Sequence, residues 1–252
     1  MKLDVETHLG AVERIVSSLE RDGRPARAVM LSRTYATAVD DLWDALTNGD
    51  RIPRWFMPVS GDLEPGGRYR LEGNAGGVIT ACEPPSRVAV TWEFGGDVSW
   101  VEVGVADEGA GRVRLTLTHT ALLSEHWEQY GPGAVGVGWE MGLLGLARHI
   151  ACPDEPKLDA VEFAESRDGK ALLAGSSELL GGGGAGGWGG PGGRAGGGQA
   201  DSGVLCGGVR VGGCRDRDTS FIVHTTPSSP HRSTLRKDTR CTRRTRTGGR
   251  TG

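Results

Sequence analysis

The sequence predicts an α+β domain in which a curved antiparallel sheet wraps around one long helix near its C-terminal end. Short apolar segments between residues 68 and 120 follow one another through glycine- and proline-rich turns, as in an antiparallel meander. The segment from Ala134 to Ile150 is apolar nearly all round, which is typical of a buried helix. With 252 residues and 37% apolar content, the chain can form a substantial core.

The N-terminal segment, residues 1–26, is expected to form an amphipathic helix. Its apolar residues recur at spacings of three and four, and Asp22-Gly23 is expected to end the helix. The residues of this pattern are Leu9, Val12, Ile15, Val16 and Leu19.

A strand is expected next, at residues 28–35, followed by two short helical pieces. Thr37 is a candidate N-cap for the first piece, which Asn48-Gly49 would end. The second piece is a helical turn within residues 50–56. These pieces lead the chain into the sheet.

Five further strands are predicted from period-2 alternation and the turns between them. They are residues 68–73, 76–83, 87–94, 98–105 and 112–120. Alternation places Val88, Val90, Trp92 and Phe94 on one face, and Val113, Leu115, Leu117 and His119 on one face of the last strand. Trp100 and Glu102 should lie on the face opposite the valines of their own strand.

The long helix is predicted to start at Pro132 and to meet water only at Glu140 and Arg148. Gly138, Gly142 and Gly145 lie within it, although each glycine costs about 1 kcal/mol relative to alanine. Two explanations stay open: close packing of the helix on the sheet, or space for a ligand beneath the helix.

This order of elements resembles the helix-grip fold of the START-like superfamily, also called SRPBCC. The segments LWDALTN, RIPRWF, PGGRY and GPGAVGVGW are similar to the branch related to the C-terminal domain of the activator of the heat-shock protein 90 ATPase. The resemblance covers residues 27–180 and implies a cavity between the sheet and the long helix. It places the turn that carries Trp55, Phe56 and Met57 near the mouth of that cavity.

The candidate ligand-binding residues follow from this resemblance and from the apolar faces of the strands. They are Trp55, Phe56, Trp92, His119 and Trp139, each of which could instead be ordinary core.

No catalytic or cofactor-binding motif is found: the sequence has no GxSxG, HExxH or GxxxxGK[ST], and we expect no catalytic residues, metal or cofactor. His119, Glu125, His126 and Glu128 form the one compact titratable cluster, and a solvent-exposed polar loop accounts for most of it. Five cysteines without CxxC spacing indicate a reducing cytoplasm. No apolar run is long enough for a signal peptide or a membrane span.

Three functions of different class therefore stay open. The first is binding of a small hydrophobic molecule between sheet and helix. The second, implied by the resemblance, is a chaperone co-factor acting through protein contact, although the activator carries a further N-terminal domain where this chain has only about 26 residues. The third is a cyclase- or dehydratase-like enzyme, which lacks a convincing acid-base pair here. A homodimer is compatible with each.

Residues 181–252 differ from the rest in composition. They carry 12 Lys and Arg against 4 Asp and Glu, a net charge of +8, whereas residues 1–180 carry −11. The glycine content predicts disorder, and the abrupt glycine run suggests a frame shift that turned alanine codons into glycine codons. The competing interpretation is a basic arm that binds nucleic acid, which the absence of aromatic residues among the arginines disfavours.

Overall fold

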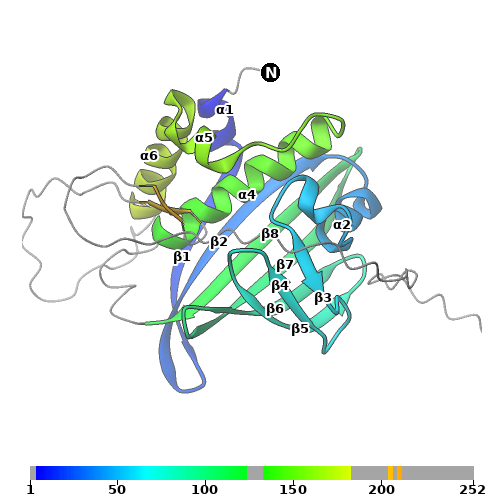
Figure 1. The fold of residues 1–252 in the computed structure, drawn as a ribbon, viewed down its shortest axis with the longest axis vertical. Coiled ribbons are helices and arrows are strands. Elements are labelled where there is room, and N and C mark those ends of the chain that lie inside the picture. The colour runs from blue at the N-terminus through cyan, green and yellow to red at the C-terminus, as the bar shows by residue number, and fades with distance from the viewer. Residues whose placement is uncertain (1–3, 124–132, 183–203, 207–208, 212–252) are drawn as a thin grey trace, which may run out of the picture.

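The structure is a computed structural model that describes residues 4–123, 133–182, 204–206 and 209–211. Its main feature is an eight-stranded antiparallel sheet with the strand order β1-β2-β8-β7-β6-β5-β4-β3, curved around helix α4 (Gly133–Ala151) (Figure 1). The strands are β1 Val12–Arg21, β2 Arg24–Ala36, β3 Val59–Gly61, β4 Arg68–Leu71, β5 Gly76–Glu83, β6 Arg87–Phe94, β7 Asp97–Gly109 and β8 Arg112–Leu122. The predicted α+β fold, a curved sheet on one long helix, is confirmed.

The other helices form two groups. Helix α2 (Val39–Thr47) and the 3-10 turn η1 (Ile52–Arg54) join β2 to β3. Helices α1 (Val5–Gly10), α5 (Ala160–Glu165) and α6 (Arg167–Gly182) gather on one side of α4, and α6 packs against both α4 and α1 (Figure 1). No helix in the described part of the chain is long and apolar enough to cross a membrane.

The predicted N-terminal helix is wrong beyond Gly10. Residues 12–21 form β1, which pairs with β2 from Val12 opposite Arg33 to Arg21 opposite Arg24. Asp22 and Gly23 both have positive φ, 52° and 71°, so the dipeptide makes a two-residue hairpin turn instead of ending a helix. Val12 and Val16 face the core while Ile15 and Leu19 stay exposed, which is the period-2 burial of a strand.

The remaining element predictions hold with small corrections. The strands predicted at 76–83 and 87–94 coincide with β5 and β6. Those predicted at 28–35, 98–105 and 112–120 fall within β2, β7 and β8, and the one predicted at 68–73 runs two residues past the end of β4. Asn48 is the C-cap of α2, as expected, but Thr37 is not its N-cap. Ala38 takes that position, and the Thr37 hydroxyl donates to the Asp41 carboxylate.

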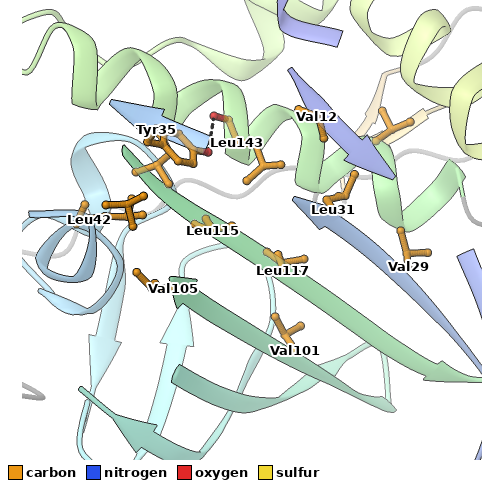
Figure 2. Packing of buried hydrophobic residues seen from close by; sticks show 14 of the residues in the cluster. Val12, Val29, Leu31, Tyr35, Leu42, Val101, Val105, Leu115, Leu117 and Leu143 are labelled. Carbon is orange, nitrogen blue, oxygen red and sulfur yellow. Dashed lines mark hydrogen bonds between the residues drawn. The ribbon is translucent and has the colours of Figure 1, made fainter. Parts of the chain in front are cut away.

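The main core lies between the inner face of the sheet and α4. Figure 2 shows Val29 and Leu31 from β2, Leu115 and Leu117 from β8, and Leu143 from α4 within this cluster. Each such side chain contributes about 1.5–3 kcal/mol when fully buried. Tyr35 donates its hydroxyl to the Leu143 carbonyl at 3.4 Å, which ties β2 to the middle of α4.

Glu140 contradicts the prediction of a wet position on α4, because its side chain is fully buried. Arg14 of β1 donates two hydrogen bonds to its carboxylate, from Nε to Oε2 at 3.0 Å and from Nη2 to Oε1 at 2.7 Å. Ser176 of α6 donates to Oε2 at 3.2 Å, and His8 Nε2 lies 3.4 Å from Oε1. A buried ionic cluster therefore joins α1, β1, α4 and α6.

The predictions for the chain after Gly181 lie almost wholly outside the described residues. Helix α6 continues to Gly182, which agrees with the helix expected up to Leu180. Beyond it the structure describes only a two-stranded hairpin, β9 (Val204–Cys206) with β10 (Val209–Val211).

Candidate functional site

A cavity of about 170 Å³ lies between the inner face of the sheet and α4. Its aromatic lining consists of Trp55, Phe56, Tyr69, Trp92 and Trp139. Aliphatic side chains from the sheet form most of the rest, among them Leu71, Ile79, Val88, Val90, Val103, Leu115 and Leu117. Leu46 and Thr47 of α2 and Gly142, Leu143 and Leu146 of α4 complete much of the boundary. The cavity thus draws on segments spread from residue 46 to residue 146.

Four of the five aromatic side chains, all except Tyr69, form a continuous series of ring contacts that runs from η1 through α4 to the sheet. Phe56 lies between Trp55 and Trp139, with ring centroids 5.3 and 6.0 Å apart, and its plane is within 14° of that of Trp139. Trp92 meets Trp139 edge to face at 5.0 Å. Such contacts hold the rings in fixed orientations.

Most lining hydroxyl and indole groups already have protein partners. Thr47 Oγ1 donates to the Trp43 carbonyl at 2.8 Å, and Trp55 Nε1 donates to the Ala45 carbonyl at 2.9 Å. The Tyr69 hydroxyl donates to the Thr91 carbonyl at 2.8 Å, and burial raises the pKa of Tyr69, so its phenol stays neutral. These groups turn their polar atoms toward the protein, which leaves an apolar interior.

His119 lies behind the aromatic wall and does not line the cavity. The indole N–H of Trp139 can only donate, and it donates to His119 Nδ1 at 2.9 Å. His119 Nε2 therefore carries the proton and donates to Ser99 Oγ at 2.8 Å, and Ser99 in turn donates to the Trp92 carbonyl at 3.1 Å. The ligand contact expected at His119 stays a prediction; the structure shows that the imidazole accepts from the Trp139 indole and so orients that ring.

Burial lowers the pKa of His119 to about 4, so the imidazole is neutral near pH 7. With both ring nitrogens hydrogen-bonded, it has no free position for a substrate proton. The other members of the titratable cluster, Glu125, His126 and Glu128, lie outside the described residues. In the part of the chain that the structure describes, no group of three or more His, Cys, Asp or Glu could hold a metal ion.

The turn that carries Trp55 and Phe56 is fastened to the segment after α4. Lys157 Nζ donates to the Phe56 carbonyl at 2.7 Å, and Arg54 Nη2 donates to the Pro153 carbonyl at 2.7 Å. Arg51 Nε donates to His149 Nε2 at 3.0 Å. These contacts fix the position of two cavity-lining rings.

The three glycines considered on α4 divide between the two explanations that the sequence left open. A Cβ on Gly145 would lie 2.5 Å from the Trp55 carbonyl oxygen, so this glycine permits close packing of α4 on the turn. Gly142 borders the cavity, where a Cβ would meet Phe56 at 3.4 Å. Gly138 faces open space among the described residues.

Gly145→Ala is expected to lower the free energy of unfolding by about 1–3 kcal/mol, because the new methyl group would overlap the Trp55 carbonyl. Gly138→Ala is the matched control and should raise it by about 1 kcal/mol, since only the helix propensity changes. Urea denaturation followed by circular dichroism measures both. Equal effects of the two substitutions would contradict the close approach at Gly145.

Four of the five candidate residues from the sequence therefore line one cavity: Trp55, Phe56, Trp92 and Trp139. Sequence reasoning missed Tyr69, whose alternation with Leu71 on β4 could have placed it on the inner face. It also missed Lys157, for which the sequence carries no signal.

One family model and several solved structures match the chain. Residues 36–151 match the family model described as activator of Hsp90 ATPase homolog 1-like protein. The chain is similar to CalU16 from Micromonospora echinospora: the solution structure is 34% identical, covers 69% of this chain and 97% of its own, and has a TM-score of 0.57. The crystal structure of CalU16 gives 32% identity, 68% and 98% coverage, and a TM-score of 0.53.

A more distant solved structure shares the fold alone. The conserved protein of unknown function EF2215 from Enterococcus faecalis is 15% identical, with 71% of this chain and 95% of that chain covered and a TM-score of 0.50. No curated protein matches the chain.

Proposed function

We propose that this chain, which belongs to the family of activator of Hsp90 ATPase homolog 1-like proteins, binds a small hydrophobic molecule in the cavity between the sheet and α4. The observation that carries the proposal is an apolar cavity of about 170 Å³ whose tryptophan and phenylalanine walls are held in place from behind. Apolar cavities of this size exclude water and accept apolar guests.

The placement of the polar groups supports binding over catalysis. Thr47, Trp55, Tyr69 and Trp139 all direct their donors to protein acceptors. His119, which is hydrogen-bonded to Trp139, is neutral and has partners on both ring nitrogens. A cavity of this kind gains free energy mainly by removing apolar surface from water.

The full-length chain tests the proposal directly. Purified protein is denatured, the released small molecules are identified by mass spectrometry, and apolar compounds are screened for an increase in melting temperature. A stoichiometric released compound, or a saturable rise in melting temperature, supports binding. Protein that releases nothing and is stabilised by no compound in the screen contradicts it.

Phe56→Ala is expected to weaken binding of such a compound by about tenfold, because the ring stacks against Trp139 and forms part of the wall. Phe94→Ala is the matched control. Phe94 follows Trp92 in the same row of β6 but is 47% exposed and does not line the cavity, so its removal should leave the affinity unchanged. Isothermal titration calorimetry measures both, and equal losses would place the site elsewhere.

A second candidate, a chaperone co-factor, is supported by the family description alone. The matching residues 36–151 include α2, η1 and all of the sheet from β3 to β8. If chaperone contact is the function, the chain should stimulate the ATPase activity of an Hsp90 partner, and Phe56→Ala should leave that stimulation unchanged. Without stimulation, the co-factor function is contradicted.

A further inference from the structure

We infer that the ligand is a neutral, planar aromatic molecule of one or two rings that carries a hydrogen-bond acceptor for Trp92 Nε1. This inference rests on the proposed binding function and adds the chemical class of the ligand. Four properties of the cavity, as the described residues line it, lead to this inference: its size, its mixture of aromatic and aliphatic walls, its uncharged lining and the unengaged indole N–H of Trp92.

The size of the cavity limits the ligand to a small ring system. Its volume is about 170 Å³. An engineered apolar cavity of about 150 Å³ in another protein binds benzene. A ligand of one ring, or of two fused rings, matches this space, whereas a sterol or a long acyl chain would require the walls to move apart.

The lining combines aromatic rings with branched aliphatic side chains, and this combination favours a flat ligand. Phe56 and Trp139 stack with their ring planes 14° apart on the side of η1 and α4. The sheet contributes two further rings, Tyr69 and Trp92, and branched aliphatic side chains, among them Val90, Val103 and Leu117. A planar aromatic ring can stack on the rings of the lining while its other face contacts methyl groups, and aromatic stacking adds to the energy of burial.

The lining described by the structure contains no charged side chain. No Asp, Glu, Lys or Arg is among the described residues that border the cavity. Lys157, from the segment after α4, directs its ammonium to the Phe56 carbonyl. A charged ligand would lose its hydration without gaining a counter-ion, so a neutral ligand is favoured.

Trp92 supplies the feature that distinguishes a ligand with an acceptor from a plain hydrocarbon. Among the lining hydroxyl and indole groups, those of Thr47, Trp55, Tyr69 and Trp139 donate to protein acceptors. Trp92 also lines the cavity, and within the described residues its indole N–H donates to no protein acceptor. Because this N–H is not among the buried polar atoms that lack a partner, it has accessible surface, which we assign to the cavity. An indole N–H can only donate, so it selects a ligand with a carbonyl, ether or ring-nitrogen acceptor.

The test compares quinoline with naphthalene, two flat probes of equal size of which only quinoline has an acceptor. With the full-length chain at pH 7.5, where quinoline is neutral, calorimetry should show quinoline binding several-fold to roughly tenfold more tightly. Trp92→Phe should bring the two affinities within about twofold of each other. Trp100→Phe is the matched control, because Trp100 lies on the opposite face of the sheet beneath Arg21, and should keep the preference.

Three outcomes would overturn the inference. If naphthalene binds the wild-type chain as tightly as quinoline does, the ligand needs no hydrogen-bond acceptor. This comparison does not depend on the folding of any variant. If the preference for quinoline persists in Trp92→Phe, a donor other than Trp92 Nε1 is responsible for it. Decanol binding more tightly than both aromatic probes excludes the aromatic class while the binding function stands, whereas failure of all three probes counts against the binding function itself.

Discussion

Arg14→Met is expected to lower the free energy of unfolding by about 3–5 kcal/mol, because it leaves the Glu140 carboxylate buried without its main counter-ion. Arg14 makes two hydrogen bonds to Glu140, whose side chain has no exposed surface. Desolvation raises the pKa of Glu140, but the neighbouring His8 ring and the hydrogen bonds from Arg14 outweigh it and hold the pKa below the ordinary value of 4.5. The carboxylate is therefore ionised in the native state at neutral pH. Urea denaturation at pH 7 measures the loss.

The double variant Arg14→Met, Glu140→Leu separates the charge from the packing. Since both charges are removed together, it should recover most of the lost stability. A double variant no more stable than Arg14→Met would show that the single substitution acts through lost packing.

The buried Glu140 carboxylate also makes a prediction about pH. A carboxyl whose pKa is lowered by folding stabilises the native state fully above pH 4.5, and this contribution disappears as the pH falls below 4.5 through the native pKa.

Local patterns predicted the meander well because each strand shows its own alternation and its own turn. The failure at β1 has a specific cause. Val12 and Val16 share a face in a helix and in a strand, so their spacing did not discriminate, whereas Asp22-Gly23 is a strong hairpin signal that favoured the strand. Glu140 was misplaced for a different reason: its partner Arg14 is 126 residues away in sequence, and no local pattern reports such a contact.

For the candidate site, the sequence predicted which face of the sheet a side chain lies on, but not what packs against that side chain. Trp92 and His119 were placed on inward faces because alternation fixes the face of a strand residue. Alternation does not show what stands between a side chain and the cavity. His119 points inward, but Trp139 of α4 covers it and Ser99 of β7 holds its other nitrogen, an arrangement that depends on the packing of three separate elements.

The buried imidazole of His119 leads to the second large effect: the native state should lose up to about 3 kcal/mol of stability between pH 6.5 and pH 4. Burial lowers the pKa of His119 from 6.5 to about 4. Between these values the unfolded chain binds a proton that the native state does not, so stability falls as the pH decreases through this range. The range lies mostly above that of Glu140, so the two groups can be distinguished. Stability curves from urea denaturation at half-unit pH steps measure the effect.

His119→Gln provides the control, since an amide does not titrate but can still accept from Trp139 and donate to Ser99. The variant should show a flatter stability curve between pH 6.5 and pH 4 than the wild-type chain. Ligand affinity should follow the same protonation, because His119 protonated on Nδ1 can no longer accept from the Trp139 indole, and the ring that forms the cavity wall loses its fixed orientation. Parallel curves for wild type and variant would contradict a pKa of His119 that is lowered by folding.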